Sequence, residues 1–198
     1  MRIISGTCKG RKLEFPSHQD IKPLTDRIKE SLFGIIEKKI PEGAVLDLYA
    51  GSGSFGLEAL SRGAKKAVFV EKHPEALRCI HNNLKSTGFK ENADVCGMDV
   101  FAYIKNAFRD RQTFGIIFFD PPFKQVEQGK FFPEAEQYAG ELLQILDSNG
   151  LMIMRIPTGL KPVCISDAFS MIRENKYGRS TVLFYRKDKN NSHRGRNE

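Results

Sequence analysis

Between residues 44 and 156, short apolar runs alternate with segments whose apolar residues recur at helical spacing, and this alternation constrains the fold most strongly. Strands that alternate with helices pair in parallel and bury both faces of the sheet under the helices. The run at 114–119 is apolar after Gly115, which predicts a central strand. The expected strands lie at 44–48, 67–70, 93–97, 114–119 and 151–156, and the expected helices at 55–63, 74–88, 99–108 and 133–147. We therefore expect an α/β fold with a mostly parallel sheet, closed by an antiparallel hairpin from 169–175 and 180–186.

The first forty residues do not follow this alternation and predict an extension of the main domain. Alternating residues at 2–5 and 11–15, with a glycine turn between them, predict a small β-hairpin. Thr25 can cap a helix whose apolar residues continue to Ile40. We expect three parts, namely the hairpin and helix at 1–40, the main domain at 41–186 and a basic, disordered tail at 187–198.

The excess positive charge lies at the two ends of the chain. The net charge of +7 divides into +4 for residues 1–40, +3 for residues 186–198 and zero for residues 41–185. A neutral body with basic ends suggests a core whose extensions meet a polyanion such as a nucleic acid. No apolar run approaches the ~20 residues that span a bilayer, so no membrane contact is expected.

Cysteine and histidine spacing gives no sign of a metal site or a disulfide framework. The four cysteines and four histidines are widely spaced and form neither a CxxC nor an HExxH pair. The start of the chain lacks the apolar segment of a secretory signal. We expect free thiols, no bound metal and a cytoplasmic location.

Two features that follow the first two strands predict a site for an adenosine-type ligand. Gly51, Gly53 and Gly56 fit the pattern GxGxxG in a loop that leads into a helix N-terminus. Glu71 ends the second strand, where a carboxylate accepts hydrogen bonds from ribose hydroxyls. Because the same pattern binds NAD, a nicotinamide-dependent enzyme is an open alternative at this point.

The loop after the fourth strand, Asp120-Pro121-Pro122-Phe123, indicates the kind of substrate. Because proline has no N–H, this rigid loop presents oxygen acceptors and few donors. Acceptors suit a substrate that donates, such as an exocyclic amino group, and Phe123 offers a flat face on which a base can stack. The loop therefore favours an amino group on a planar base as the substrate.

Residues 47–53 (DLYAGSG) together with this loop resemble class I S-adenosylmethionine-dependent methyltransferases that act on amino groups. The segments RIISG at 2–6, GRKL at 10–13, KPLTDRIKE at 22–30 and GLEALSRGA at 56–64 further resemble the RsmD family of 16S ribosomal RNA guanine-N2 methyltransferases. The resemblance covers about residues 2–186. It implies a Rossmann-like class I methyltransferase sheet and methylation of one guanine, position 966 of that RNA. The chain departs from the family pattern at Tyr49, where Phe is common, and at Arg155, where an acidic residue is more usual; the second departure bears on substrate contact.

The resemblance also implies a role for each candidate site residue. S-adenosylmethionine would be held by Asp47, Tyr49, Gly51, Ser52, Gly53, Glu71, Met98 and Asp99. The catalytic residues would be Asp120, Pro121, Pro122 and Phe123, with the flipped guanine stacked on Phe123 and its amino group donating to Asp120 and the Pro121 carbonyl. RNA would be bound by Lys9, Arg11, Lys12, Thr25, Asp26 and Arg27. The expected partner is 16S rRNA, free or within an assembling small ribosomal subunit, and the chain is expected to act as a monomer.

Three alternatives stay open at this stage. An adenine-N6 methyltransferase of DNA or RNA would share the Asp-Pro-Pro-Phe loop, but it would be expected to carry a further recognition domain. A NAD-dependent oxidoreductase would leave that loop unexplained, and the sequence offers it no Tyr-x-x-x-Lys pair or placed histidine as a proton donor. A non-catalytic RNA-binding module would need neither the glycine loop nor Glu71.

Overall fold

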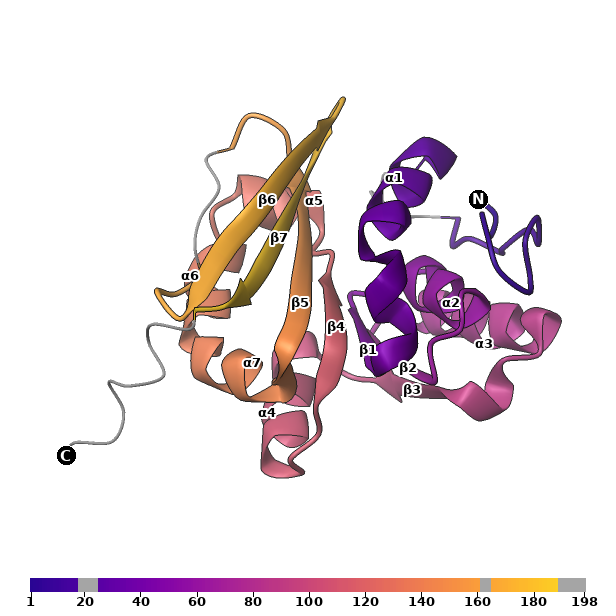
Figure 1. Ribbon diagram of the computed structural model, residues 1–198, viewed down its shortest axis with the longest axis horizontal. Helices are drawn as coiled ribbons and strands as arrows, with labels where there is room; N and C mark the ends of the chain where they lie inside the picture. Colours follow the sequence, from indigo (N-terminus) through magenta and orange to yellow (C-terminus); the bar gives the residue numbers. More distant parts are fainter. Residues whose placement is uncertain (18–24, 161–164, 189–198) are drawn as a thin grey trace.

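The computed structural model describes residues 1–17, 25–160 and 165–188, which form a seven-stranded sheet in the order β3-β2-β1-β4-β5-β7-β6 (Figure 1). Strands β1 to β5 are parallel, and β7 and β6 run antiparallel at one edge. The strands are β1 (Ala44–Leu48), β2 (Lys66–Glu71), β3 (Ala93–Gly97), β4 (Phe114–Phe119), β5 (Leu146–Pro157), β6 (Phe169–Tyr177) and β7 (Ser180–Lys187). This confirms the α/β class, the mostly parallel sheet and the closing hairpin.

Helices cover both faces of the sheet, because successive side chains of each strand point to opposite faces. Val45 of β1 joins one buried core and Leu46 joins the other. The first face carries α1 (Asp26–Ile36), the 3-10 segment η1 (Glu37–Glu42), α2 (Ser54–Ser61) and α3 (Pro74–Thr87). The second face carries α4 (Val100–Arg109), α5 (Phe123–Glu127), α6 (Phe131–Gln137) and α7 (Ala139–Ile145). A short 3-10 segment, η2 (Lys90–Asn92), precedes β3.

One expectation about local structure is wrong, and a second is confirmed only over a shorter stretch. The helix expected at 133–147 is divided into α6 and α7, and β5 begins earlier than expected because Leu146 pairs with Phe114, with an irregularity before the regular pairing resumes. The hairpin expected at 2–5 and 11–15 is present but shorter. It has one bridge, between Arg2 and Lys12, and the Ile3 N–H donates to the Arg11 carbonyl at 2.9 Å while the Ile3 carbonyl accepts the Gly10 N–H at 2.9 Å. The N–H groups of Ile4 and Ser5 donate to a side chain of α2 instead of to a partner strand.

The N-terminal segment shares a core with the helices of the first face. Ile3 and Leu13 are buried in the same cluster as Leu32 and Phe33 of α1. The boundary at residue 40 stays a prediction. Residues 189–198 of the expected tail lie outside the described residues, and Lys187 is the last residue of β7.

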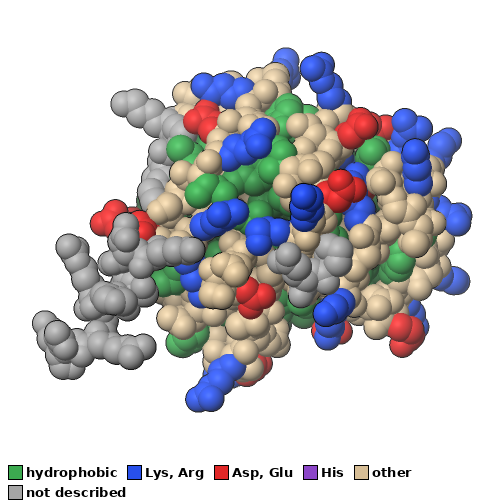
Figure 2. Space-filling view, in the orientation of Figure 1, with side chains coloured by type: hydrophobic (Ala, Val, Ile, Leu, Met, Phe, Trp, Pro, Cys, Tyr) green, Lys and Arg blue, Asp and Glu red, His purple; other side chains and the backbone are tan. Residues whose placement is uncertain are grey.

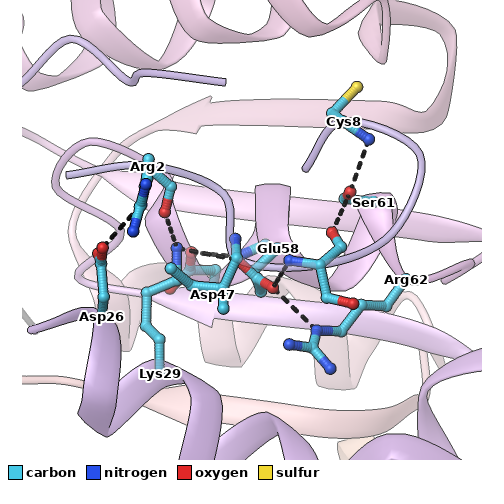
Figure 3. A network of polar contacts seen from close by, with 11 residues as sticks. Arg2, Cys8, Asp26, Lys29, Asp47, Glu58, Ser61 and Arg62 are labelled. Atoms are coloured by element: carbon cyan, nitrogen blue, oxygen red, sulfur yellow. Dashed lines mark hydrogen bonds and ion pairs between the residues drawn. The ribbon is translucent and has the colours of Figure 1, made fainter. Parts of the chain in front are cut away.

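Glu58 of α2 fastens the N-terminal segment through a fully buried carboxylate (Figure 3). Its Oε2 accepts the Ile4 N–H at 2.8 Å and pairs with Lys29 Nζ at 3.0 Å. Its Oε1 accepts the Ser5 N–H at 3.1 Å and pairs with Arg62 Nε at 2.8 Å. One carboxylate therefore ties the start of the chain to α1 and α2.

Candidate active site

The loop between β1 and α2 has a backbone conformation that would allow a ligand to approach it closely. Tyr49, Gly51 and Gly53 adopt left-handed φ angles of 59°, 56° and 77°. At Gly56, a Cβ would lie 2.3 Å from a ring carbon of Phe69, so only glycine lets α2 approach β2 this closely. The glycine pattern therefore serves two purposes, namely the turn itself and the packing of the helix that follows.

Glu71, at the end of β2, is oriented by three backbone N–H groups. Its Oε2 accepts from Gly51 at 2.9 Å, and its Oε1 accepts from Lys72 at 2.8 Å and His73 at 2.9 Å. Because each carboxylate oxygen can accept two hydrogen bonds, Oε2 keeps capacity for a ribose hydroxyl. The carboxylate is held against the glycine loop, as a ribose site requires.

Asp47 lies fully buried under the same loop. Its Oδ2 accepts the Gly56 N–H at 2.9 Å, whereas among the described residues neither Asp47 Oδ1 nor Ser54 Oγ has a hydrogen-bond partner. Burial raises the pKa of Asp47 well above its ordinary value, and the charges of Asp120 and Glu71 add to the rise. Unpartnered buried polar atoms beside a glycine loop fit a site completed by a polar ligand, such as the amino acid part of S-adenosylmethionine.

Asp99 and Met98 follow β3 at the same edge of the sheet. Asp99 caps α4 by accepting the Phe101 N–H at 3.0 Å, and it pairs with Lys72 Nζ at 3.1 Å. Burial alone would raise the pKa of Asp99, but the hydrogen bonds from Lys72 and from the helix N–H groups outweigh it and lower the pKa. The chain thus keeps an ionised acceptor where the adenine amino group is expected, with Met98 half-buried beside it.

The Asp-Pro-Pro-Phe loop lies next to the glycine loop, at the carboxyl end of β4. The Asp120 N–H donates to the Leu48 carbonyl at 3.4 Å, which joins the two loops. The Asp120 side chain forms a two-point ion pair with Arg155 of β5, with Nε–Oδ1 at 2.7 Å and Nη2–Oδ2 at 2.9 Å. The register places Phe119 opposite Met154, so Asp120 and Arg155 follow as neighbours. Arg155, at which the sequence departs from the family pattern, therefore contacts the expected catalytic carboxylate of Asp120.

Phe123 is covered in the structure. It begins α5, a short helix that the sequence did not predict, and only 8% of its surface is exposed. The Arg155 guanidinium carbon lies 4.9 Å from the centroid of the Phe123 ring. Pro121 is also buried and Pro122 is exposed. The stacking role of Phe123 stays a prediction, and in this arrangement it requires Arg155 to move.

The expected RNA contacts lie on the N-terminal segment and at the start of α1. Lys9, Arg11, Lys12, Thr25 and Arg27 are exposed, and Asp26 is half-buried. Thr25 caps α1 and Asp26 pairs with Arg2 at 2.8 Å, so these two also have structural partners. Figure 2 shows Lys and Arg side chains spread over one face of the molecule, several of them around an apolar area in its upper middle.

Three polar residues that the sequence patterns did not indicate hold this arrangement together: Glu58, Lys29 and Asn83. Asn83 of α3 donates to the Ser52 carbonyl at 2.9 Å and accepts the Glu14 N–H at 2.7 Å, which couples the glycine loop to the N-terminal segment. For Glu58 a signal was available, because it is a charged residue within α2, a helix in which every residue is buried.

Neither a metal site nor a membrane-spanning helix is present in the described part of the chain. Residues 1–17, 25–160 and 165–188 contain no group of three or more His, Cys, Asp or Glu side chains that could hold a metal ion. Within the same ranges, none of the helices has both the length and the apolar character needed to cross a bilayer.

Comparison with known proteins identifies the family. A model of the family described as Conserved hypothetical protein 95 matches residues 1–186. The chain belongs to this family. It is 33% identical over 188 residues to "Putative rRNA methyltransferase YlbH" of Bacillus subtilis, covering 94% of this chain and 99% of that protein. It is 32% identical over 189 residues to "Ribosomal RNA small subunit methyltransferase D" of Haemophilus influenzae, covering 94% and 92%.

A solved structure agrees with this family in fold. The protein described as "Putative methyltransferase yhhF from Escherichia coli" superposes with a TM-score of 0.74 at 28% identity, covering 95% of this chain and 98% of that one. These findings confirm the resemblance to the RsmD family and the Rossmann-like methyltransferase fold. They favour a methyltransferase over the nicotinamide-dependent alternative, although GxGxxG with Glu71 fits both.

Proposed function

We propose that this protein transfers a methyl group from S-adenosylmethionine to the exocyclic N2 of a guanine in 16S rRNA. The observation that carries the proposal is the Asp120–Leu48 backbone hydrogen bond, which joins the Asp-Pro-Pro-Phe loop, with its oxygen acceptors, to the glycine loop. The family supports it, because its relatives are named as rRNA methyltransferases. We extend the proposal to the cytoplasm as location, to a monomer as active form, and to free rRNA or the assembling small subunit as substrate.

The cofactor site fits a cationic, ribose-bearing donor. Asp47 and the loop at 51–53 would hold the amino acid part, since Asp47 Oδ1 lacks a partner among the described residues. Glu71 would accept from the ribose hydroxyls, and Asp99 from the adenine amino group, with Tyr49 and Met98 beside them. When bound, S-adenosylmethionine supplies an electrophilic methyl group on a positively charged sulfur.

The chain contributes mainly by positioning the target nitrogen. The Asp120 carboxylate and the Pro121 carbonyl accept the N–H bonds of the guanine amino group, which turns its lone pair toward the methyl group. The proton that the methylated nitrogen loses passes to Asp120 or to water. No histidine base is needed, because the methylated nitrogen is acidic.

Substitution of Asp120 tests this assignment. The Asp120→Ala and Asp120→Asn variants should lose methyl transfer by more than about a hundredfold, while the affinity for S-adenosylhomocysteine stays within about threefold of wild type. The substrate is rRNA from cells that lack the gene. The product is digested to nucleosides, and mass spectrometry distinguishes N2-methylguanosine from N6-methyladenosine. Asp110→Ala, which removes an exposed carboxylate at the end of α4, is the control. A variant at Asp120 that keeps most of its turnover, or a product methylated on adenine, would contradict the proposal.

A further inference from the structure

The place that the proposed function reserves for the target base is filled by a side chain of the protein itself. Arg155 donates to both oxygens of Asp120, at 2.7 and 2.9 Å, and its guanidinium lies over the ring of Phe123. Only 6% of the Arg155 side chain and 13% of the Asp120 side chain are exposed. A base therefore cannot contact both Asp120 and Phe123 while Arg155 keeps this position.

The guanidinium and the edge of guanine offer a carboxylate the same donors. Arginine presents two parallel N–H groups on a planar, conjugated unit, which pair with both oxygens of a carboxylate. Guanine presents N1–H and N2–H in the same parallel arrangement on a planar ring. Both can also lie on an aromatic face. They are chemical competitors for one carboxylate and one ring.

The side chain of Arg155 can make room, whereas its backbone cannot. The backbone lies within β5, between β4 and β7, where Arg155 pairs with Val182 and the preceding Met154 pairs with Phe119. A strand bonded on both sides cannot shift without breaking both ladders. The long side chain, in contrast, lies near the carboxyl end of β5 and can rotate about its own bonds.

We propose that Arg155 occupies the base subsite of the free protein as a stand-in for guanine, and that the target guanine displaces it from Asp120. This inference rests on the proposed function, since it concerns the same subsite. The exchange replaces two donors by two donors, so a largely buried carboxylate is not left without partners. It also releases Asp120 from the guanidinium at the stage when the amino group must lose a proton.

Removing the guanidinium tests the inference. The variants are Arg155→Met, Arg155→Ala in case Met itself fills the subsite, and Arg173→Met as a control that removes an exposed positive charge from β6. Calorimetry measures binding of guanosine monophosphate in the presence of S-adenosylhomocysteine, whose own affinity reports an intact fold and cofactor site. Methyl transfer to unmethylated small-subunit rRNA gives kcat and KM separately.

Both Arg155 variants should bind guanosine monophosphate at least roughly tenfold more tightly than wild type, since a tenfold gain corresponds to about one of the two charge-assisted hydrogen bonds that no longer have to be broken. Their KM for rRNA should fall, and Arg173→Met should change neither quantity in this direction. Unchanged or weaker nucleotide binding in both variants would overturn the inference, as would a fall in kcat at constant KM, which would make Arg155 a positioning residue for Asp120. If the wild type methylates no rRNA but the variants bind the nucleotide more tightly, the proposed function fails and the assignment of the subsite stands.

Discussion

Replacing Glu58 by Gln should destabilise the protein far more than replacing its buried partner Lys29 by Met. The Glu58 carboxylate is fully buried and accepts from Lys29, Arg62 and the N–H groups of Ile4 and Ser5. Gln keeps the shape but removes the charge, and its amide group turns a donor toward other donors. The Lys29 ammonium, also fully buried, then loses its ion-pair partner, and losing one partner of a buried pair costs about 3–5 kcal/mol.

Lys29→Met should lower the free energy of unfolding less than Glu58→Gln does. Met fills a similar volume, and Glu58 keeps Arg62 at 2.8 Å and both backbone donors. The lost interactions are the bonds from Lys29 Nζ to Glu58 at 3.0 Å and to the Arg2 carbonyl at 2.9 Å. Burial lowers the pKa of Lys29, opposed by the charge of Glu58, so removing the ammonium also relieves a desolvation cost. We expect a loss of about 1–3 kcal/mol.

Urea unfolding of the two single variants and the double variant gives the three free energies. The double variant should lose less than the sum of the single losses, because the Glu58→Gln substitution leaves no buried ammonium behind once Lys29 has been replaced by Met. Against a typical stability of about 5–15 kcal/mol, the Glu58→Gln loss is large enough to measure. A loss below about 1 kcal/mol for Glu58→Gln, or strict additivity, would show that the buried charge network does not stabilise the fold as argued.

Two further predictions concern the cofactor site and the RNA surface. Because burial raises the pKa of Asp47, the folded protein holds a proton that the unfolded chain releases, and stability falls as the pH rises from near 3.8 through the raised pKa. Asp47→Asn should therefore gain stability relative to wild type as the pH rises through that window, and lose S-adenosylhomocysteine binding; a pH-independent difference in unfolding midpoint would refute this. Neutralising Arg11 and Lys12 together should weaken rRNA binding and make the slope of log K against log salt shallower by about 1.4–1.8. An unchanged slope, or an equal change in an Arg109→Gln control on α4, would argue against RNA contact by these two residues.

Much of the fold and of the cofactor site follows from local pattern. Side chains repeat their direction every two residues along a strand and every 3.6 residues along a helix. The alternation from residue 44 to 156 therefore predicts the strands and the helices that cover both faces of the sheet. The glycines at 51, 53 and 56 and the carboxylate at 71 were found in the same way, because a tight turn and a strand end each restrict which residues fit. The RNA-binding and catalytic roles drawn from the resemblance stay predictions.

Local pattern failed where a distant partner decided the outcome. The N-terminal hairpin is shorter than expected because, beyond Ile3, the N–H groups of Ile4 and Ser5 donate to Glu58, more than fifty positions away in the chain. The helix expected to reach residue 147 ends early because Leu146 pairs with Phe114 in the sheet. In both cases the backbone groups form hydrogen bonds with partners that are distant in the sequence, in place of the nearby partners that the local pattern implies.

Local sequence patterns predict the parallel strands, the glycine loop and the Asp-Pro-Pro-Phe loop of the candidate site, but neither α5 nor the division between α6 and α7. That these two loops adjoin depends on the order of the strands in the sheet, which sets β4 beside β1. The contact between Arg155 and Asp120 depends on the register of β5 against β4, which makes the two residues neighbours. Periodicity along a chain determines which face of an element is apolar, but strand order and register arise from packing the whole core, and they determine which polar groups meet.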